Sequence, residues 1–172
     1  IRNTFLVSIY SLLFGFPLSM MLALLINEVK NKTFKRTVQT ISYMPYFIST
    51  VVICGMIKAY LSQDGFISQI VSYITGNAPY NLLGDPKHFR TIFVVSDLWQ
   101  SIGWNSIIYL AALSGVDQEL YESAWIDGAG RLRQLWHITL PGIAPTIVIL
   151  LILSVGSLLS VNDAKILLLY TP

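Results

Sequence analysis

Four long apolar stretches alternate with polar segments along the chain, over residues 4–26, 40–61, 91–113 and 143–161. Each stretch is long enough to cross the roughly 30 Å hydrocarbon core of a bilayer, which takes about 20 helical residues. A backbone in lipid must satisfy its own hydrogen bonds, so each stretch is expected to form a membrane-spanning α-helix. The pattern predicts an all-α integral membrane protein with about four spans in a helical bundle.

The composition also favours a membrane protein. Hydrophobic residues make up 54% of the 172 residues and charged residues only 12%, whereas about 25% of residues are charged in a typical soluble domain. One core in a chain of this length cannot bury so much apolar surface, and disordered chains are polar and charged. The net charge of +2 comes from scattered residues and does not indicate a nucleic-acid partner.

The basic residues predict an orientation. The loop over residues 27–39 holds four of them and the loop over residues 114–142 holds two, whereas the loop over residues 62–90 holds only Lys87 and Arg90. The positive-inside rule then places the first and third loops in the cytoplasm. Both ends of the chain are expected on the opposite side.

The third loop carries helix signals of its own. Asp117 suits a helix N-cap, and Gly128 and Gly130 can end that helix in a left-handed turn. A second short amphipathic helix is expected around Leu132, and Pro141 suits the first turn of the fourth span. The loop is therefore predicted to form two short helices at the cytoplasmic surface. From this pattern alone, a helix that only lies on the lipid headgroups is an equal alternative.

The loop also carries a spaced motif, Glu122-Ser123-Ala124, then Gly128, then Ile138 and Leu140-Pro141. This spacing resembles the EAA loop in the permease subunits of ATP-binding-cassette importers that use an extracytoplasmic binding protein. In that family the loop forms a coupling helix that docks in a groove of the cytoplasmic ATPase. Ser123 departs from the family's usual alanine. The resemblance assigns the ATPase contact to Glu122, Ser123, Ala124, Asp127, Gly128, Ile138, Leu140 and Pro141.

The resemblance extends over nearly the whole chain. Residues 15–18, 22–27 and 43–49 look like permease spans, and residues 127–131, 137–143 and 166–172 are similar to the sugar-transporting branch, especially its oligosaccharide and polysaccharide members. Residues 161–165 depart from that pattern. The implied architecture is a type I importer permease fold, in which residues 1–172 form a single domain that lacks further spans at both ends. Residues 114–141 would be the coupling loop between the third and fourth spans.

The resemblance implies a function and a set of partners. The chain would be a multi-pass subunit in the bacterial cytoplasmic membrane that imports a carbohydrate, an oligosaccharide, by alternating access. Its partners would be cytoplasmic ATPase subunits, a homologous or identical second permease subunit, an extracytoplasmic solute-binding protein and the lipid bilayer. ATP and Mg²⁺ would bind to the ATPase, and this chain would bind no cofactor.

A polar face on the third span is the candidate substrate path. Its members recur at helical spacing, so they share one side of the helix: Asp97, Gln100, Ser101, Trp104 and Asn105. A polar face within a membrane must meet protein or water, and an intramembrane aspartate is a functional candidate. Indole faces suit sugar rings, and the carboxylate and amide groups suit hydroxyls. The alternative is that Asp97 is an ordinary interhelical partner and that Trp104 only packs the span.

Small residues and prolines give further structural predictions. Stripes on the first and fourth spans are expected to let helices pack closely: Ser8, Ser11, Gly15 and Ser19, and Ser154, Ser157 and Ser160. Pro17 and Pro45 are expected to kink their spans, with neighbouring groups satisfying the freed carbonyls.

No catalytic set or metal site is apparent in the sequence. The phosphate-cradling motif GxxxxGK[ST] is missing, so the chain is not expected to be the ATPase. His88 and His137 are expected on opposite sides of the membrane and cannot share a metal. Two alternatives remain, a permease for another class of solute and a membrane-embedded enzyme or channel that uses the polar face around Asp97. An EAA-like loop has no use in an enzyme or channel.

Overall fold

The computed structural model describes residues 2–76, 78, 80–84, 86–158 and 163–169. Within these residues every regular element is a helix and no strand occurs, as predicted. The longer helices are α1 (Arg2–Glu28), α2 (Lys32–Tyr43), α3 (Thr50–Leu61), α4 (Phe66–Thr75), α5 (Pro86–Ser114), α6 (Gln118–Ile126) and α8 (Leu140–Gly156). The shorter ones are α7 (Arg131–Gln134), α9 (Asp163–Leu169), the 3₁₀ turns η1 (Met44–Phe47) and η2 (Leu82–Gly84), and the π-helical turn η3 (Leu135–Thr139).

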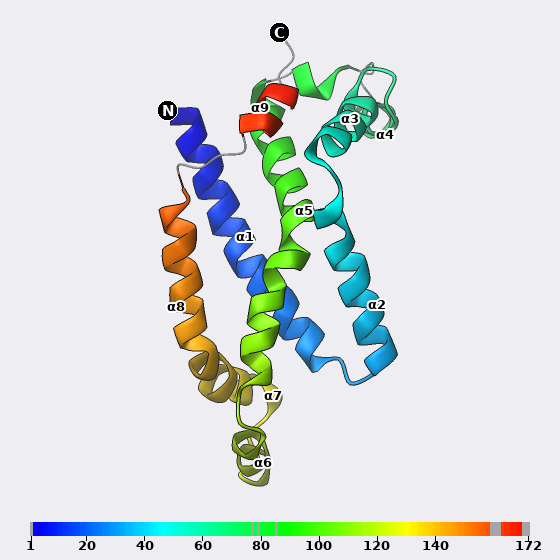
Figure 1. Cartoon of the computed structure of the whole chain (residues 1–172). Helices are drawn as coiled ribbons and strands as arrows, with labels where there is room; N and C mark the ends of the chain where they lie inside the picture. Colours follow the sequence, from blue (N-terminus) through cyan, green and yellow to red (C-terminus); the bar gives the residue numbers. More distant parts are fainter. Residues whose placement is uncertain (1, 77, 79, 85, 159–162, 170–172) are drawn as a thin grey trace.

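The long helices form an elongated bundle (Figure 1). Helix α1 packs along α5, α8 runs beside them, and α2 lies on the other side of α5. The two ends of the chain lie at one end of the bundle, together with α3, α4 and α9. Helices α6 and α7 and the α1–α2 connection lie at the opposite end. The first and third loops therefore share one end, as the charge pattern requires.

Two described helices are long and apolar enough to cross a membrane, Thr4–Glu28 and Arg131–Gly156. A third candidate arises if Lys32–Phe47 and Thr50–Thr75, which are bent by 94°, count as one broken span. Helix α5 has 29 residues, which makes it about 43 Å long at about 1.5 Å per residue. Its polar positions make it less apolar than α1 and α8. The expectation of four spans therefore remains a prediction.

The predicted second span over residues 40–61 is not one continuous helix. Its first part already begins at Lys32, inside the predicted loop, where the Asn31 side chain caps α2 by accepting hydrogen bonds from two backbone amides. Pro45 follows the end of α2, and Ile48 is extended, with φ −79° and ψ 130°. Because proline has no N–H to donate, the helix breaks there and α3 leaves at a steep angle. The kink predicted at Pro45 is thus a full break, whereas α1 continues through Pro17.

The fourth span also differs from its prediction over residues 143–161. The helical path that contains it begins at Arg131 and runs through η3 into α8 without a loop. Pro141 lies in the first turn of α8, as predicted. Residues 159–162 lie outside the described part of the chain, so the predicted end of this span falls there.

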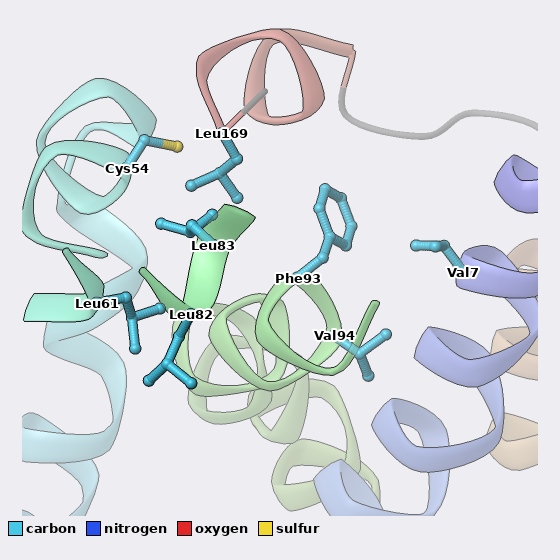
Figure 2. Close-up of a cluster of buried hydrophobic side chains, with 8 residues drawn as sticks. All are labelled: Val7, Cys54, Leu61, Leu82, Leu83, Phe93, Val94 and Leu169. Carbon is cyan, nitrogen blue, oxygen red and sulfur yellow. The ribbon is translucent and has the colours of Figure 1, made fainter. Parts of the chain in front are cut away.

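Buried apolar side chains form two clusters at different heights along α5. The upper cluster, shown in Figure 2, joins α1, α3, η2, α5 and α9 through Val7, Cys54, Leu61, Leu82, Leu83, Phe93, Val94 and Leu169. The lower cluster joins α1, α5 and α8 through Ala23, Tyr109, Leu113, Val116 and Ile143. The polar positions of α5 lie between the two clusters. Apolar packing therefore holds the helices together on both sides of the polar part of α5.

A glycine lets α2 approach α5 closely. Gly103 is buried, and a Cβ atom built on it would overlap the backbone carbonyl of Ser42 on α2. This contact lies just before the break at Pro45. The side-chain-free position therefore sets how near the broken span lies to α5.

We expect Gly103→Ala to destabilise the protein by about 1–3 kcal/mol, because the added methyl group must push α2 away. The unfolding temperature of the detergent-solubilised full-length protein measures this. Gly55→Ala on α3 is the matched control, since no heavy atom lies within 4 Å of its added Cβ. That substitution is expected to leave stability unchanged or raise it by about 0.5–1 kcal/mol. An unchanged unfolding temperature for Gly103→Ala would show that α2 moves aside freely.

Candidate functional site

The segment over residues 114–141 begins with a capped helix. The Asp117 carboxylate accepts a hydrogen bond from the backbone N–H of Glu119 at 3.0 Å. Glu119 lies in the first turn of α6, where a negative charge is favourable. The cap predicted at Asp117 is therefore confirmed, and it fixes where α6 starts.

A left-handed turn at Gly128 ends α6. Its φ is +72°, and its N–H donates to the carbonyl of Trp125 at 3.0 Å. The N–H of Ala129 donates to the carbonyl of Ala124 at 2.8 Å, which completes a Schellman motif. The prediction for Gly128 is confirmed and that for Gly130 is wrong, since Gly130 has φ −67° and is the N-cap of α7.

Side-chain hydrogen bonds fasten α6 to the long helix that follows. The Tyr121 hydroxyl lies 2.9 Å from the Oγ1 of Thr139, which is buried in η3. The Gln134 side chain donates to the carbonyl of Ala129 at 2.9 Å. An exposed ion pair between Glu28 and Arg131 at 4.0 Å adds little, because solvent screens it. The segment is thus a folded unit attached to the N-terminal end of α8.

The surface of this segment exposes the motif residues and several large apolar side chains. Glu122, Ser123, Asp127, Gly128 and Pro141 are exposed, Ala124 and Leu140 are half-buried, and Ile138 packs on the lower cluster. Trp125, Ile126 and Leu132 are 77%, 81% and 74% exposed. Grouped apolar exposure of this kind is typical of surfaces that bind a partner protein or lie against lipid. Ile126 belongs to this surface, although the helical pattern did not single it out.

A cavity of about 340 Å³ lies between α1, α5 and α8. Its polar lining comes from three helices: Ser8, Ser11 and Ser19, then Asp97, Ser101 and Asn105, then Ser154 and Ser157. Phe93 of the upper cluster and Tyr109 of the lower cluster also line it, so it extends along α5 between the two. The stripes of small residues were predicted to be packing surfaces. Gly15 does pack closely, since a Cβ there would lie 3.2 Å from Leu98, but it also lines the cavity, as do the serines of both stripes apart from Ser160, which lies outside the described residues.

The cavity wall is rich in hydrogen-bond acceptors. The hydroxyls of Ser8, Ser101 and Ser154 each donate to a backbone carbonyl of their own helix, at 3.0, 2.7 and 2.7 Å. Their protons are therefore used, and their lone pairs remain to accept. The buried Oγ of Ser19 has no hydrogen-bond partner among the described residues. A ligand with several hydroxyl donors fits this wall.

An ion pair lies behind the upper part of the cavity wall. The Nζ of Lys165, on α9, is 3.4 Å from the Oδ1 of Asp97 and 5.0 Å from the centre of the Phe93 ring. The Lys165 side chain is fully buried, whereas 36% of the Asp97 side chain is exposed. Asp97 lines the cavity and Lys165 is not among the lining residues. Sequence reasoning missed this lysine, and the signal available was that residues 161–165 depart from the sugar-branch pattern.

The other two residues of the predicted polar face point to the broken span. The Gln100 side chain donates to the carbonyl of Ile48 at 3.2 Å. Trp104 stacks on Tyr46 with ring centres 4.5 Å apart and contacts Phe47 edge-on at 5.5 Å. Gln100 thus satisfies a carbonyl at the break, as expected for a proline-interrupted span. Of the five path residues predicted, the structure brings Asp97, Ser101 and Asn105 to the cavity and the other two to the break.

Comparison with known proteins gives a consistent set of relatives. The family described as "Binding-protein-dependent transport system inner membrane component" matches residues 15–169. Protein LplB of Bacillus subtilis (strain 168) is 42% identical over 170 residues, which are 98% of this chain and 53% of that protein. The polygalacturonan/rhamnogalacturonan transport system permease protein YteP, from the same organism, is 41% identical over 169 residues, again 98% and 53% of the two chains. The chain therefore spans about half the length of these curated relatives.

Two solved structures have the same fold. One is the crystal structure of a bacterial ABC transporter involved in the import of the acidic polysaccharide alginate. It has a TM-score of 0.94 and 44% identity, over 100% of this chain and 60% of that chain. The other shows a bacterial alginate ABC transporter in complex with an alginate pentasaccharide-bound periplasmic protein, with the same TM-score, identity and coverage.

Proposed function

The chain belongs to the family of inner membrane components of binding-protein-dependent transport systems, and from this we propose that it is a permease subunit of an ATP-binding-cassette importer for oligosaccharides. The polysaccharide-related names of YteP and of the alginate transporter support this class of cargo. The acceptor-rich cavity, which suits ligands with many hydroxyl donors, supports it independently. The alginate transporter's description as an importer of an acidic polysaccharide favours cargo that carries carboxylates.

The observation that carries the proposal is the folded segment at one end of the bundle. Helix α6 and the Gly128 turn project there, with Glu122 and Asp127 exposed beside apolar side chains. We propose that this surface is the coupling helix and seats in a groove of the ATPase, where a basic residue pairs with a carboxylate. ATP and Mg²⁺ bind to the ATPase, and this chain binds no cofactor.

The connection from α6 to α8 suggests how ATPase closure reaches the cavity. Tyr121 contacts Thr139 at 2.9 Å, and the helix continues from Arg131 to Gly156 without a loop. A displacement of α6 would therefore tilt α8, which forms one wall of the cavity. Such a tilt opens the cavity to alternate sides of the membrane, in a two-state equilibrium that ATP and the loaded binding protein both bias. The π-helical turn η3 lies at the junction, and turns of this kind often occur at functional positions.

The remaining partners follow from the orientation. We place the α6 end in the cytoplasm of a bacterium and the end with α3, α4 and α9 outside its cytoplasmic membrane, in keeping with the basic residues of the first and third loops. The outer end is where an extracytoplasmic binding protein delivers cargo. A second permease subunit, homologous or identical, completes the pathway. Asp97, Ser101 and Asn105 contact the sugar, while Gln100 and Trp104 hold the broken span against α5.

Affinity purification of the full-length protein from its native membrane tests this function. An ATP-binding-cassette ATPase is expected to co-purify, and the reconstituted assembly is expected to take up an oligosaccharide only when both ATP and the loaded binding protein are present. The control replaces Glu122 with lysine on the exposed face of α6, which is expected to lose the ATPase while the permease still folds. Full-length protein that never retains an ATPase would contradict the proposal.

A further inference from the structure

We infer that Lys165 is a specificity-determining residue: by pairing with Asp97 behind the cavity wall, it cancels the wall's negative charge and so admits oligosaccharides that carry carboxylates. This inference rests on the proposed function. It concerns α9, a short helix whose sequence departs from the sugar-branch pattern at this point. The lysine itself does not touch the cargo in this arrangement.

The geometry of the pair gives the first step. Lys165 is fully buried, with its Nζ 3.4 Å from the Asp97 carboxylate and 5.0 Å from the Phe93 ring centre. A buried cation is stable only when it is compensated, and both the carboxylate and the aromatic face do this. The lysine is therefore fixed behind Asp97 and cannot extend into the cavity without losing these contacts.

The position of Asp97 gives the second step. Asp97 is the only charged side chain among the described residues that line the cavity, and about a third of its side chain is exposed there. Without a cation behind it, this carboxylate would give the cavity one uncompensated negative charge. Because about two thirds of the Asp97 side chain is covered by protein, water screens this charge only in part.

The consequence for cargo differs between sugars. A neutral oligosaccharide donates its hydroxyls to Asp97 whether or not Lys165 is present. A carboxylate about 10 Å from an uncompensated Asp97 would be repelled, and at an effective dielectric constant of about 20 this lowers its occupancy on the order of 10-fold. Lys165 thus acts on acidic sugars selectively, through the charge of its partner.

Removing the charge of Lys165, the charge of Asp97, or both tests the inference. Uptake of an alginate pentasaccharide and of its carboxyl-reduced counterpart is measured in proteoliposomes that contain the full importer and saturating binding protein. Lys165→Met is expected to lower acidic uptake on the order of 10-fold relative to neutral uptake. Asp97→Asn leaves the cation uncompensated and is expected to shift the ratio the other way. The double variant Asp97→Asn/Lys165→Met is expected to return the ratio to near the wild-type value.

Two further variants separate charge from folding. Lys165→Arg keeps the cation and is expected to retain the wild-type ratio, whereas Lys58→Met, which removes an exposed lysine on α3, is expected to change nothing. If Lys165→Met and Asp97→Asn lower acidic uptake alike, Lys165 only anchors α9 and the inference is wrong. The same holds if Lys165→Met lowers uptake of both sugars equally. A wild-type importer that takes up no oligosaccharide, acidic or neutral, would instead contradict the proposed function, and this inference with it.

Discussion

Gly128→Val is expected to weaken the contact with the ATPase and to lower oligosaccharide uptake by at least about 10-fold, because the left-handed backbone costs an L-residue about 1–2 kcal/mol and a β-branched one more. Gly128 has φ +72° and lies where α6 turns back to α7. Valine would force the turn open and break the hydrogen bonds that close it. Glu122 and Asp127 would then no longer present one surface to the ATPase.

The loss would be specific to the turn and would not reflect general misfolding. No heavy atom lies within 4 Å of a Cβ added at Gly128, so the substitution acts through the left-handed backbone and not through crowding at the Cβ. Gly130→Ala is the matched control, two residues away in the same connection. It has an ordinary φ of −67° and equally open space around its Cβ. We therefore expect Gly130→Ala to transport normally.

The measurement compares three quantities in each variant: the amount of ATPase that co-purifies, the rate of ATP hydrolysis and the rate of ATP-driven uptake. Gly128→Val is expected to lower the first and the third, while the unfolding temperature of the permease stays near the wild-type value. Full uptake by Gly128→Val would show that the turn conformation does not matter for coupling. The assignment of α6 as the coupling helix would then lose its main support.

The apolar pattern was sufficient to predict a helical membrane protein but not how the second span is divided. Residues 40–61 are mostly apolar, and hydropathy does not record that Pro45 withholds an N–H. At the sharp turn at Ile48, Gln100 donates a hydrogen bond to the Ile48 carbonyl from another helix. That contact joins residues 52 apart in sequence, so no local pattern predicts it.

The polar face of α5 shows the same limit at the level of the site. At about 100° per residue, its five predicted members occupy one arc about 140° wide. Asp97, Ser101 and Asn105 take one side of the arc, and Gln100 and Trp104 take the other. Periodicity correctly predicted the arc. Only the positions of the neighbouring helices divide it into a cavity wall and a contact with the broken span.

The serine stripes and Lys165 explain why the cavity itself was not predicted. A small residue repeated on one helix face suits close packing and a cavity lining equally well, so the stripes on α1 and α8 do not distinguish the two. The partner of Asp97 lies 68 residues away on α9. Residues 161–165 stood out only as a departure from the family pattern, although this departure contains the buried cation.

Ser101→Phe is expected to abolish uptake while the ATPase still binds, because the ring would occupy the middle of the cavity. Ser101 lies on α5 between Asp97 and Asn105, one helical turn from each, and all three line the same space of about 340 Å³. The Ser101 hydroxyl donates to the carbonyl of Asp97 at 2.7 Å, so its side chain is already directed along the wall. A phenyl group at this position leaves no continuous path for an oligosaccharide.

Two control variants distinguish lost space from lost hydrogen bonding and from damage to the helix. Val95→Phe places the same phenyl group on α5 at a side chain that is 58% exposed, and we expect it to transport normally. Ser101→Ala keeps the cavity open and removes one acceptor, so uptake is expected to fall by less than about 10-fold. Uptake that persists in Ser101→Phe would place the cargo path outside this cavity. Equal loss in Ser101→Ala and Ser101→Phe would mean that the hydroxyl itself, and not the open space, limits transport.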